Sequence, residues 1–246
     1  MTSATPLRWA EVHTAAIEHN TASILSWLQP GTALMAMVKA DGYGHGAETA
    51  ARAAIAGGAT WLGVYAPEEA LMLRGAGVRQ RMLVTGFTPH ADLVALVQAD
   101  VDVSVFDVES VVTLAATAGA GAARCHIKLD TGLGRLGISP QDVAELLRAL
   151  RQRRDRITVA GVFTHFADTD PESSYTTAQD AALQEVAALV HADWPDAVVH
   201  AAGSAAIIGR HDTHHDLVRP GIALYGCAPA GLSPPSPLQP AMHAFA

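Results

Sequence analysis

Short apolar runs alternate with stretches of helical periodicity along most of the 246 residues. The runs are typical of buried parallel strands. They predict strands at Ala33–Lys39, Trp61–Tyr65, Met82–Thr85, Val101–Phe106, Cys125–Leu129, Val159–Thr164, Val198–Ala201 and, weakly, Leu217–Val218. The periodicity predicts helices that include Trp9–Trp27, Pro67–Arg74, Val108–Ala118, Val143–Arg151 and Thr176–Val190. Eight strands with seven intervening helical patterns indicate an α/β (β/α)8 barrel of the TIM type, although the count alone leaves a doubly wound sheet open.

The amino-acid composition and the hydrophobic pattern of the chain change after Gly226. Residues 229–240 contain five prolines and no apolar periodicity, which predicts an extended linker. Only six residues follow this segment. We therefore expect residues 1–228 to form the barrel domain and residues 229–246 to lie outside it.

Composition narrows the classes of function. A net charge of -8 argues against nucleic acid as the main partner. The two cysteines, Cys125 and Cys227, give neither a disulfide framework nor metal-ligand spacing, and their apolar contexts predict buried, reduced thiols. Residues 1–6 carry no apolar signal region, and no segment reads as a membrane span. These features predict a cytoplasmic protein with no membrane partner.

The most informative segment is the lysine that ends the first predicted strand. Lys39 is followed by a glycine-rich turn that contains Tyr43. In α/β barrels the carboxyl ends of the strands carry the ligand site. A partly desolvated amine there can lose its proton and attack a carbonyl to form a Schiff base. The alternative is a strand-capping lysine whose amine reaches water.

Five segments together resemble the alanine racemase family, whose members bind pyridoxal phosphate. They are Ala36–Gly46, Lys128–Gly137, Thr164–Ala167, His200–Ala205 and Val218–Gly226. The resemblance implies a barrel at the amino end of a longer chain, and a second, strand-rich domain that begins where this chain stops. On that basis we expect an isolated or truncated barrel, with residues 229–246 as linker and start of the second domain.

The resemblance also implies how the cofactor is held. Lys39 would bind its aldehyde and act as acid and base on one face of the substrate. Ser204 and the backbone N–H groups of Gly221 and Ile222 would cradle the phosphate, with a further bond from Tyr43. Ser204 as a plain helix cap, and Gly221 as a turn after proline, are the alternatives.

Arg219 would face the pyridine nitrogen of the cofactor. Arginine keeps its proton at ordinary pH, so it would leave that nitrogen unprotonated and weaken the ring as an electron sink. A surface arginine after a strand is the alternative. Position 203 departs from the family, because Gly203 stands where asparagine is usual. The missing amide would weaken the positioning of the cofactor.

Three more residues complete the implied site. Arg135 resembles the arginine that bonds the cofactor's phenolic oxygen, and Lys128 matches a lysine that is carbamylated in many relatives. A carbamate would hold Arg135 by a charge-assisted contact; a solvated Lys128 is the alternative. His165 matches a histidine that connects to a tyrosine of the second domain, or is a satisfied histidine at a strand end. The resemblance thus implies Lys39, Arg135, His165 and Arg219 as catalytic.

Two further motifs are discounted. Gly132–Gly137 has the G-x-G-x-x-G form, but it follows the fifth predicted strand, and no acidic residue stands at a predicted strand end about 20 positions on. His211–Asp216 is rich in potential metal ligands without a regular ligand spacing, so we expect a solvated loop and no metal.

The function that the resemblance implies is interconversion of L- and D-alanine for cell-wall precursors, impaired in a lone barrel. A non-catalytic pyridoxal phosphate-binding barrel, or a serine or broad-spectrum amino-acid racemase, are the alternatives. The family implies a homodimer for the full-length protein, and we expect a monomer or weak dimer for this chain.

Overall fold

Eight parallel strands form the centre of the molecule. The computed structural model describes residues 8–118, 123–168, 170 and 172–245. Within these ranges the central strands are β2 (Ala33–Met37), β3 (Trp61–Val64), β4 (Arg81–Val84), β5 (Asp102–Val105), β6 (Ala123–Lys128), β7 (Ile157–Phe163), β8 (Val198–His200) and β9 (Leu217–Val218). They lie in the order β8-β7-β6-β5-β4-β3-β2-β9. All eight predicted strands are confirmed, with small differences at their ends.

The ring closes between β8 and β9 through two backbone hydrogen bonds and one side-chain hydrogen bond instead of a regular ladder. Asp216, just before β9, donates its backbone N–H to the carbonyl of Val199 (3.2 Å). Its carboxylate accepts the N–H of Val199 at 2.8 Å. Beyond the strands, the N–H of Arg219 bonds the carbonyl of Ala202 at 2.8 Å. These bonds join the first and last strands of the sheet order, which confirms the barrel over the doubly wound sheet.

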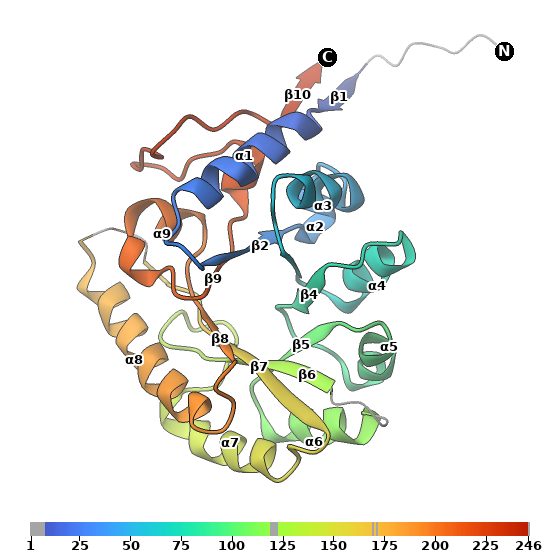
Figure 1. Cartoon of the computed structure of the whole chain (residues 1–246), viewed down its shortest axis with the longest axis vertical. Coiled ribbons are helices and arrows are strands. Elements are labelled where there is room, and N and C mark those ends of the chain that lie inside the picture. Colours follow the sequence, from blue (N-terminus) through green and yellow to red (C-terminus); the bar gives the residue numbers. More distant parts are fainter. Residues whose placement is uncertain (1–7, 119–122, 169, 171, 246) are drawn as a thin grey trace, which may run out of the picture.

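Helices cover the outside of the ring (Figure 1). They are α1 (Thr14–Ser26), α3 (Ala47–Ala56), α4 (Pro67–Gly75), α5 (Leu93–Gln98), α6 (Val108–Thr117), α7 (Val143–Arg151), α8 (Ser174–His191) and the short α9 (Ser204–Gly209). The α2 turn (Lys39–Tyr43) and the 3-10 turns η1 (His90–Asp92), η2 (Pro140–Asp142), η3 (His211–Thr213) and η4 (Ile222–Tyr225) lie in the connections. The predicted helices over residues 67–74, 108–118, 143–151 and 176–190 are therefore confirmed.

The core has an apolar outer layer and a mixed interior. Between strands and helices, side chains such as Ile24, Leu62 and Leu146 are fully buried. Inside the ring lies a second apolar cluster of Met35, Met37, Trp61, Leu83, Phe163 and Leu217. The buried polar residues of the interior include Asp102, His126, Lys128, His200 and Arg219. The interior is thus packed, as in other barrels of this type, but it contains several ionisable groups.

The start of the chain differs from the prediction. Residues Trp9–Val12 form strand β1 instead of the first turn of a helix, and α1 begins only at Thr14. Strand β1 pairs antiparallel with β10 (Met242–Phe245), so both ends of the described chain meet beyond α1 (Figure 1). A helical prediction failed here because the partner strand lies more than 200 residues away in sequence, where local periodicity carries no information.

The proline-rich segment lies against the barrel. Gln239 donates its N–H to the side-chain oxygen of Asn20 at 2.7 Å, and the amide of Asn20 donates back to the carbonyls of Gln239 and Leu224 at 2.8 and 2.9 Å. The indole of Trp27 bonds the Ser236 hydroxyl at 3.2 Å. The domain boundary at residue 228 stays a prediction.

Two expectations about side-chain exposure need correction. Cys125 is buried as predicted, but Cys227 is exposed, because it follows η4 on the loop that leaves the barrel. The segment His211–Asp216 is only partly solvated, since Thr213 and His214 are buried against α9 and its loop. Within the described ranges, no three His, Cys, Asp or Glu side chains are placed to hold a metal ion. In the same ranges no helix combines the length and the apolarity needed to cross a membrane.

Candidate functional site

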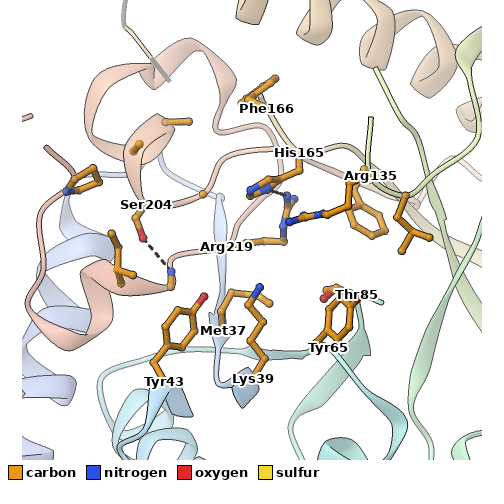
Figure 2. Close-up of a pocket in the computed structure, with 18 of the residues that line it drawn as sticks. Met37, Lys39, Tyr43, Tyr65, Thr85, Arg135, His165, Phe166, Ser204 and Arg219 are labelled. Carbon is orange, nitrogen blue, oxygen red and sulfur yellow. Dashed lines mark hydrogen bonds between the residues drawn. The ribbon is translucent and has the colours of Figure 1, made fainter. Parts of the chain in front are cut away.

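A cavity of about 290 Å³ opens at the carboxyl end of the strands. Figure 2 shows Lys39 and Tyr43 entering it from one side, and Arg219, His165 and Arg135 facing them from the other. The cavity wall also includes Lys128, Gly203, Ser204, Gly221 and Ile222. The structure therefore brings together every residue that the sequence implied for the site, and it does so where barrel enzymes place their chemistry.

Lys39 is presented by an unusual backbone. The residues after it, Ala40, Asp41 and Tyr43, have φ values of 51°, 51° and 55°, a left-handed conformation that is costly for non-glycine residues. The carboxylate of Glu69 holds this turn, accepting the N–H of Ala40 at 2.6 Å together with two N–H groups after β3. Strain of this kind persists only where neighbours impose it, and it clusters at functional sites. Glu69 is a functional candidate that the sequence reasoning missed.

The charge of Lys39 is destabilised by its surroundings. Burial lowers the pKa of its amine, and the positive charges of Arg135 and Arg219 lower it further, while Glu69 opposes them. The neutral amine is the nucleophilic form, so this environment favours attack on a carbonyl. The centre of the Tyr65 ring lies 6.0 Å from the amine. The alternative of a strand-capping lysine whose amine reaches water does not fit, because the amine is desolvated in the cavity.

Ser204, Gly221 and Tyr43 form a small polar corner. The Ser204 hydroxyl accepts the N–H of Gly221 at 3.0 Å and that of Ala223 at 3.2 Å. It does not cap α9, whose first residue it is, so the plain helix-cap alternative is wrong. A Cβ built at Gly221 would collide with the Tyr43 hydroxyl, so only glycine lets that hydroxyl approach the backbone. Hydroxyls and backbone N–H groups gathered at a helix start suit a phosphate.

Arg219 is buried at the floor of the cavity. Its guanidinium donates to the carbonyls of Thr164 and Ala201 at 2.7 and 2.9 Å, and to the Nδ1 atom of His200 at 2.8 Å. Burial lowers its pKa to about 9, which still leaves it protonated at neutral pH. The surface-arginine alternative is wrong. Arg219 can only donate, so it offers hydrogen bonds to an acceptor and keeps that acceptor unprotonated.

Lys128, at the end of β6, lines the cavity. It is 3 % exposed, which excludes the solvated-lysine alternative, and its amine lies 4.7 Å from the centre of the Phe163 ring. Burial, followed by the charges of Arg219 and Arg135, lowers its pKa to about 7. With a pKa of about 7, a substantial fraction of the amine is neutral at neutral pH and can react with carbon dioxide, and the resulting anion would lie near Arg219 and Arg135. Its carbamylation stays a prediction.

Arg135 and His165 occupy the cavity rim. Arg135 is exposed on the loop after β6, where the Asp130 carboxylate accepts the N–H groups of Gly132 and Gly134, both at 3.0 Å. His165 follows β7, and its Nδ1 lies 3.4 Å from the guanidinium of Arg219. Burial and that positive charge lower the pKa of His165 to about 3. His165 is therefore a neutral group at working pH.

The residues present fit pyridoxal phosphate. The amine of Lys39 can bind the aldehyde, and the polar corner at Gly221 can hold the phosphate. Arg219 is a buried donor for the ring nitrogen, and Arg135 lies on the remaining side of the cavity. At Gly203, where the resemblance implied an asparagine, a Cβ would have only the His165 ring within 4 Å, at 3.4 Å. The residue-by-residue roles remain proposals, which the fit supports.

Comparison with known proteins identifies the family of the chain. Residues 12–229 match the family described as alanine racemase, N-terminal domain. The alanine racemase of Symbiobacterium thermophilum is 41 % identical over 242 residues, which are 95 % of this chain and 63 % of the relative. That of Thermobifida fusca is 43 % identical over 95 % of this chain and 64 % of its own length.

Solved structures give the same result. The alanine racemase from Streptomyces coelicolor A3(2) superimposes with a TM-score of 0.91 at 38 % identity, covering 96 % of this chain and 65 % of that one. The enzyme from D-cycloserine-producing Streptomyces lavendulae gives 0.90 at 36 % identity, covering 98 % and 65 %. The chain thus spans slightly less than two thirds of the length of these relatives.

Proposed function

The chain belongs to the family of alanine racemase N-terminal domains, and from that premise we propose that it is the pyridoxal phosphate-binding barrel of an amino-acid racemase that interconverts L- and D-alanine for cell-wall precursors. The observation that carries the proposal is the amine of Lys39, whose pKa is lowered by burial and by two arginines; it faces the buried donor Arg219 in a cavity that also contains the polar corner of Ser204, Gly221 and Tyr43. Alanine racemases are pyridoxal phosphate enzymes, and bound cofactor supplies the electron withdrawal that acidifies the α-proton of the substrate.

Each residue has a defined task in this proposal. Lys39 holds the cofactor's aldehyde and moves a proton at the substrate α-carbon on the face it approaches. Arg219 donates to the ring nitrogen and keeps it unprotonated, which limits electron withdrawal and suppresses side reactions. Ser204, Gly221 and Tyr43 anchor the phosphate, with the N–H of Ile222 beside them.

Racemisation needs proton transfer on both faces of the α-carbon. Lys39 supplies one face. His165, with a pKa of about 3, is a neutral residue that we assign to the hydrogen-bonded wall and not to the second proton transfer. General acid–base groups typically contribute about 10²–10⁴-fold. We therefore expect the 246 residues alone to exchange the α-proton of alanine faster than they racemise it.

The experiment follows the α-proton of L-alanine in D₂O by proton NMR, and D-alanine by chiral chromatography, with the chain saturated in cofactor. Exchange should exceed racemisation, and both should vanish in Lys39→Ala. The exposed Arg52→Lys variant, outside the cavity, should match the unaltered chain. Bound cofactor without any exchange would contradict the proposal and favour a non-catalytic cofactor barrel. Faster exchange of L-serine would favour the broader-specificity alternative.

Assembly and location belong to the same proposal. We infer a homodimer for the longer protein, a monomer or weak dimer for these 246 residues, and a cytoplasmic site of action. Sedimentation of the chain with and without cofactor checks the first two inferences.

A further inference from the structure

A line of buried polar side chains runs through the barrel interior beneath the cavity. Arg219 Nη1 lies 2.8 Å from His200 Nδ1, His200 Nε2 lies 2.9 Å from His126 Nδ1, and His126 Nε2 lies 3.4 Å from the carboxylate of Asp102. His200, His126 and Asp102 are each 0 % exposed. They come from the end of β8, the middle of β6 and the start of β5, so the line crosses the barrel between its two ends.

The chemistry of its two ends fixes the direction of every hydrogen bond. A guanidinium can only donate and a carboxylate can only accept. His200 must therefore accept at Nδ1 and carry its proton on Nε2, which it donates to His126. His126 in turn accepts at Nδ1 and donates from Nε2 to Asp102. Both rings are neutral in this arrangement, and burial lowers the pKa of each, in His200 well below its ordinary value.

The barrel is built around this line. A Cβ at Gly161 on β7 would collide with the His126 ring and lie 2.8 Å from the carbonyl of Val198. The β6–β7 pairing shifts register at His126. The ring of Phe163 stacks on His200 with 4.6 Å between centres and a 5° interplanar angle. The glycine at position 161, the register shift at His126 and the stacking of Phe163 on His200 thus all make room for the two imidazoles.

Asp102 is held as an anion at the far end. Arg81 Nε and Arg124 Nε contact its two oxygens at 3.1 and 2.6 Å. Burial alone would raise the pKa of this carboxyl, but the bond from His126 and the two guanidinium charges lower it overall. A permanent acceptor therefore terminates the line at physiological pH.

We propose that Asp102 and His126 are positioning residues for Arg219, because the carboxylate sets the tautomers of both histidines so that His200 presents a bare Nδ1 to the guanidinium. If the line lost its anionic end, His126 and His200 could reverse their protons. An Nδ1–H on His200 would then point at the guanidinium donor and push Arg219 out of place. The consequence for the cofactor rests on the proposed function, whereas the tautomer order does not.

The test reads the tautomers directly in the protein without cofactor. Long-range ¹H–¹⁵N correlation spectra of histidine-labelled protein distinguish Nδ1–H from Nε2–H imidazoles. The unaltered chain should show Nε2–H for both His126 and His200. Asp102→Asn should give a mixed or reversed His200 tautomer, while Arg81→Gln, which touches Asp102 but not the imidazoles, should keep Nε2–H. A merely structural role for Asp102 would lower stability without changing the His200 tautomer, and that result in a folded Asp102→Asn variant would overturn the proposal.

Two further readouts separate the possible failures. Should Asp102→Asn not fold, an Nδ1–H signal from His200 in the unaltered chain would overturn the proposal, and Nε2–H signals from both rings would support it. Cofactor-loaded Asp102→Asn should exchange the alanine α-proton about 10-fold more slowly, by kcat more than by KM. Reversed tautomers with unchanged exchange would overturn the role toward Arg219. A third outcome is that the tautomers reverse in Asp102→Asn but neither this variant nor the unaltered chain binds the cofactor. That result would refute the proposed function and leave the tautomer order standing.

Discussion

Replacing Lys128 by methionine should stabilise the cofactor-free barrel, and the gain should shrink as pH rises. The side chain is 3 % exposed, and burial with the charges of Arg219 and Arg135 lowers its pKa from 10.5 to about 7. Methionine has a similar length, no charge, and the flexibility to fill the same space. The substitution therefore removes an unfavourable buried charge and creates little cavity.

The pH dependence follows from proton linkage. Below pH 7 the amine is protonated in both folded and unfolded chains, so the folded state bears the whole cost of the buried charge. Between pH 7 and 10.5 the unfolded chain binds more protons than the folded one, so stability of the unaltered chain rises with pH. Above 10.5 the cost is gone. Methionine at position 128 removes this dependence.

The pKa shift of Lys128 sets an upper limit on the stability gained by Lys128→Met. A change from 10.5 to about 7 corresponds to an upper limit of about 5 kcal/mol at roughly 1.4 kcal/mol per pH unit. The lost contact between the ammonium and the Phe163 ring offsets about 1 kcal/mol of this, and relaxation around the charge reduces it further. We expect a gain of about 2–3 kcal/mol at pH 6–7 that approaches zero near pH 10.

Urea unfolding of both proteins in carbon dioxide-free buffer, followed by circular dichroism from pH 6 to 10, measures the gap. Lys39→Met is the matched control, because Lys39 is the chain's other lysine and is only partly buried. Its gap should be smaller and should depend less on pH. A Lys128→Met gap that is independent of pH, or that widens as pH rises, would refute the reasoning.

Three other outcomes are expected. Bicarbonate should stabilise the unaltered chain but not Lys128→Met, and native mass spectrometry should show the added mass of one carbon dioxide; equal responses would argue against a carbamate. Gly221→Ala should weaken cofactor affinity by about 1–3 kcal/mol, because its methyl group displaces the Tyr43 hydroxyl, and Tyr43→Phe should recover part of the loss in a fluorescence titration. Gly203→Asn should tighten the cofactor by about 1 kcal/mol if its amide forms one net hydrogen bond, and unchanged or weaker binding would contradict this.

The strands and the catalytic end of the barrel could be predicted because they depend on local patterns. Apolar runs such as that before Lys39 end where turn residues begin, and the family motifs follow those ends. The left-handed turn at Ala40 and Asp41 could not be predicted, since alanine does not favour positive φ and Glu69, from another helix, holds the N–H of Ala40. The capping position of Glu69 near the start of α4 was the available signal.

The buried line of Arg219, His200, His126 and Asp102 could not be predicted from the sequence, for a different reason. His126 and Asp102 lie in short strands whose residues alternate between the ring interior and the helices, but pairing them requires the order and register of the whole barrel. His200 stood in one of the recognised motifs without an assigned role. A histidine or aspartate inside an apolar strand was a usable signal, because buried ionisable groups require partners.

Reduction of the cofactor-loaded chain with borohydride, followed by peptide mapping, tests most directly whether Lys39 is the cofactor lysine. Lys39 and Lys128 are the only lysines in the sequence, so the label has few possible sites. Both lysines line the cavity, but Lys39 is partly exposed whereas Lys128 is 3 % exposed. We predict stoichiometric label on Lys39 and none on Lys128. Label on Lys128 or the amino terminus, or no label at saturating cofactor, would contradict the assignment of Lys39 as the cofactor lysine.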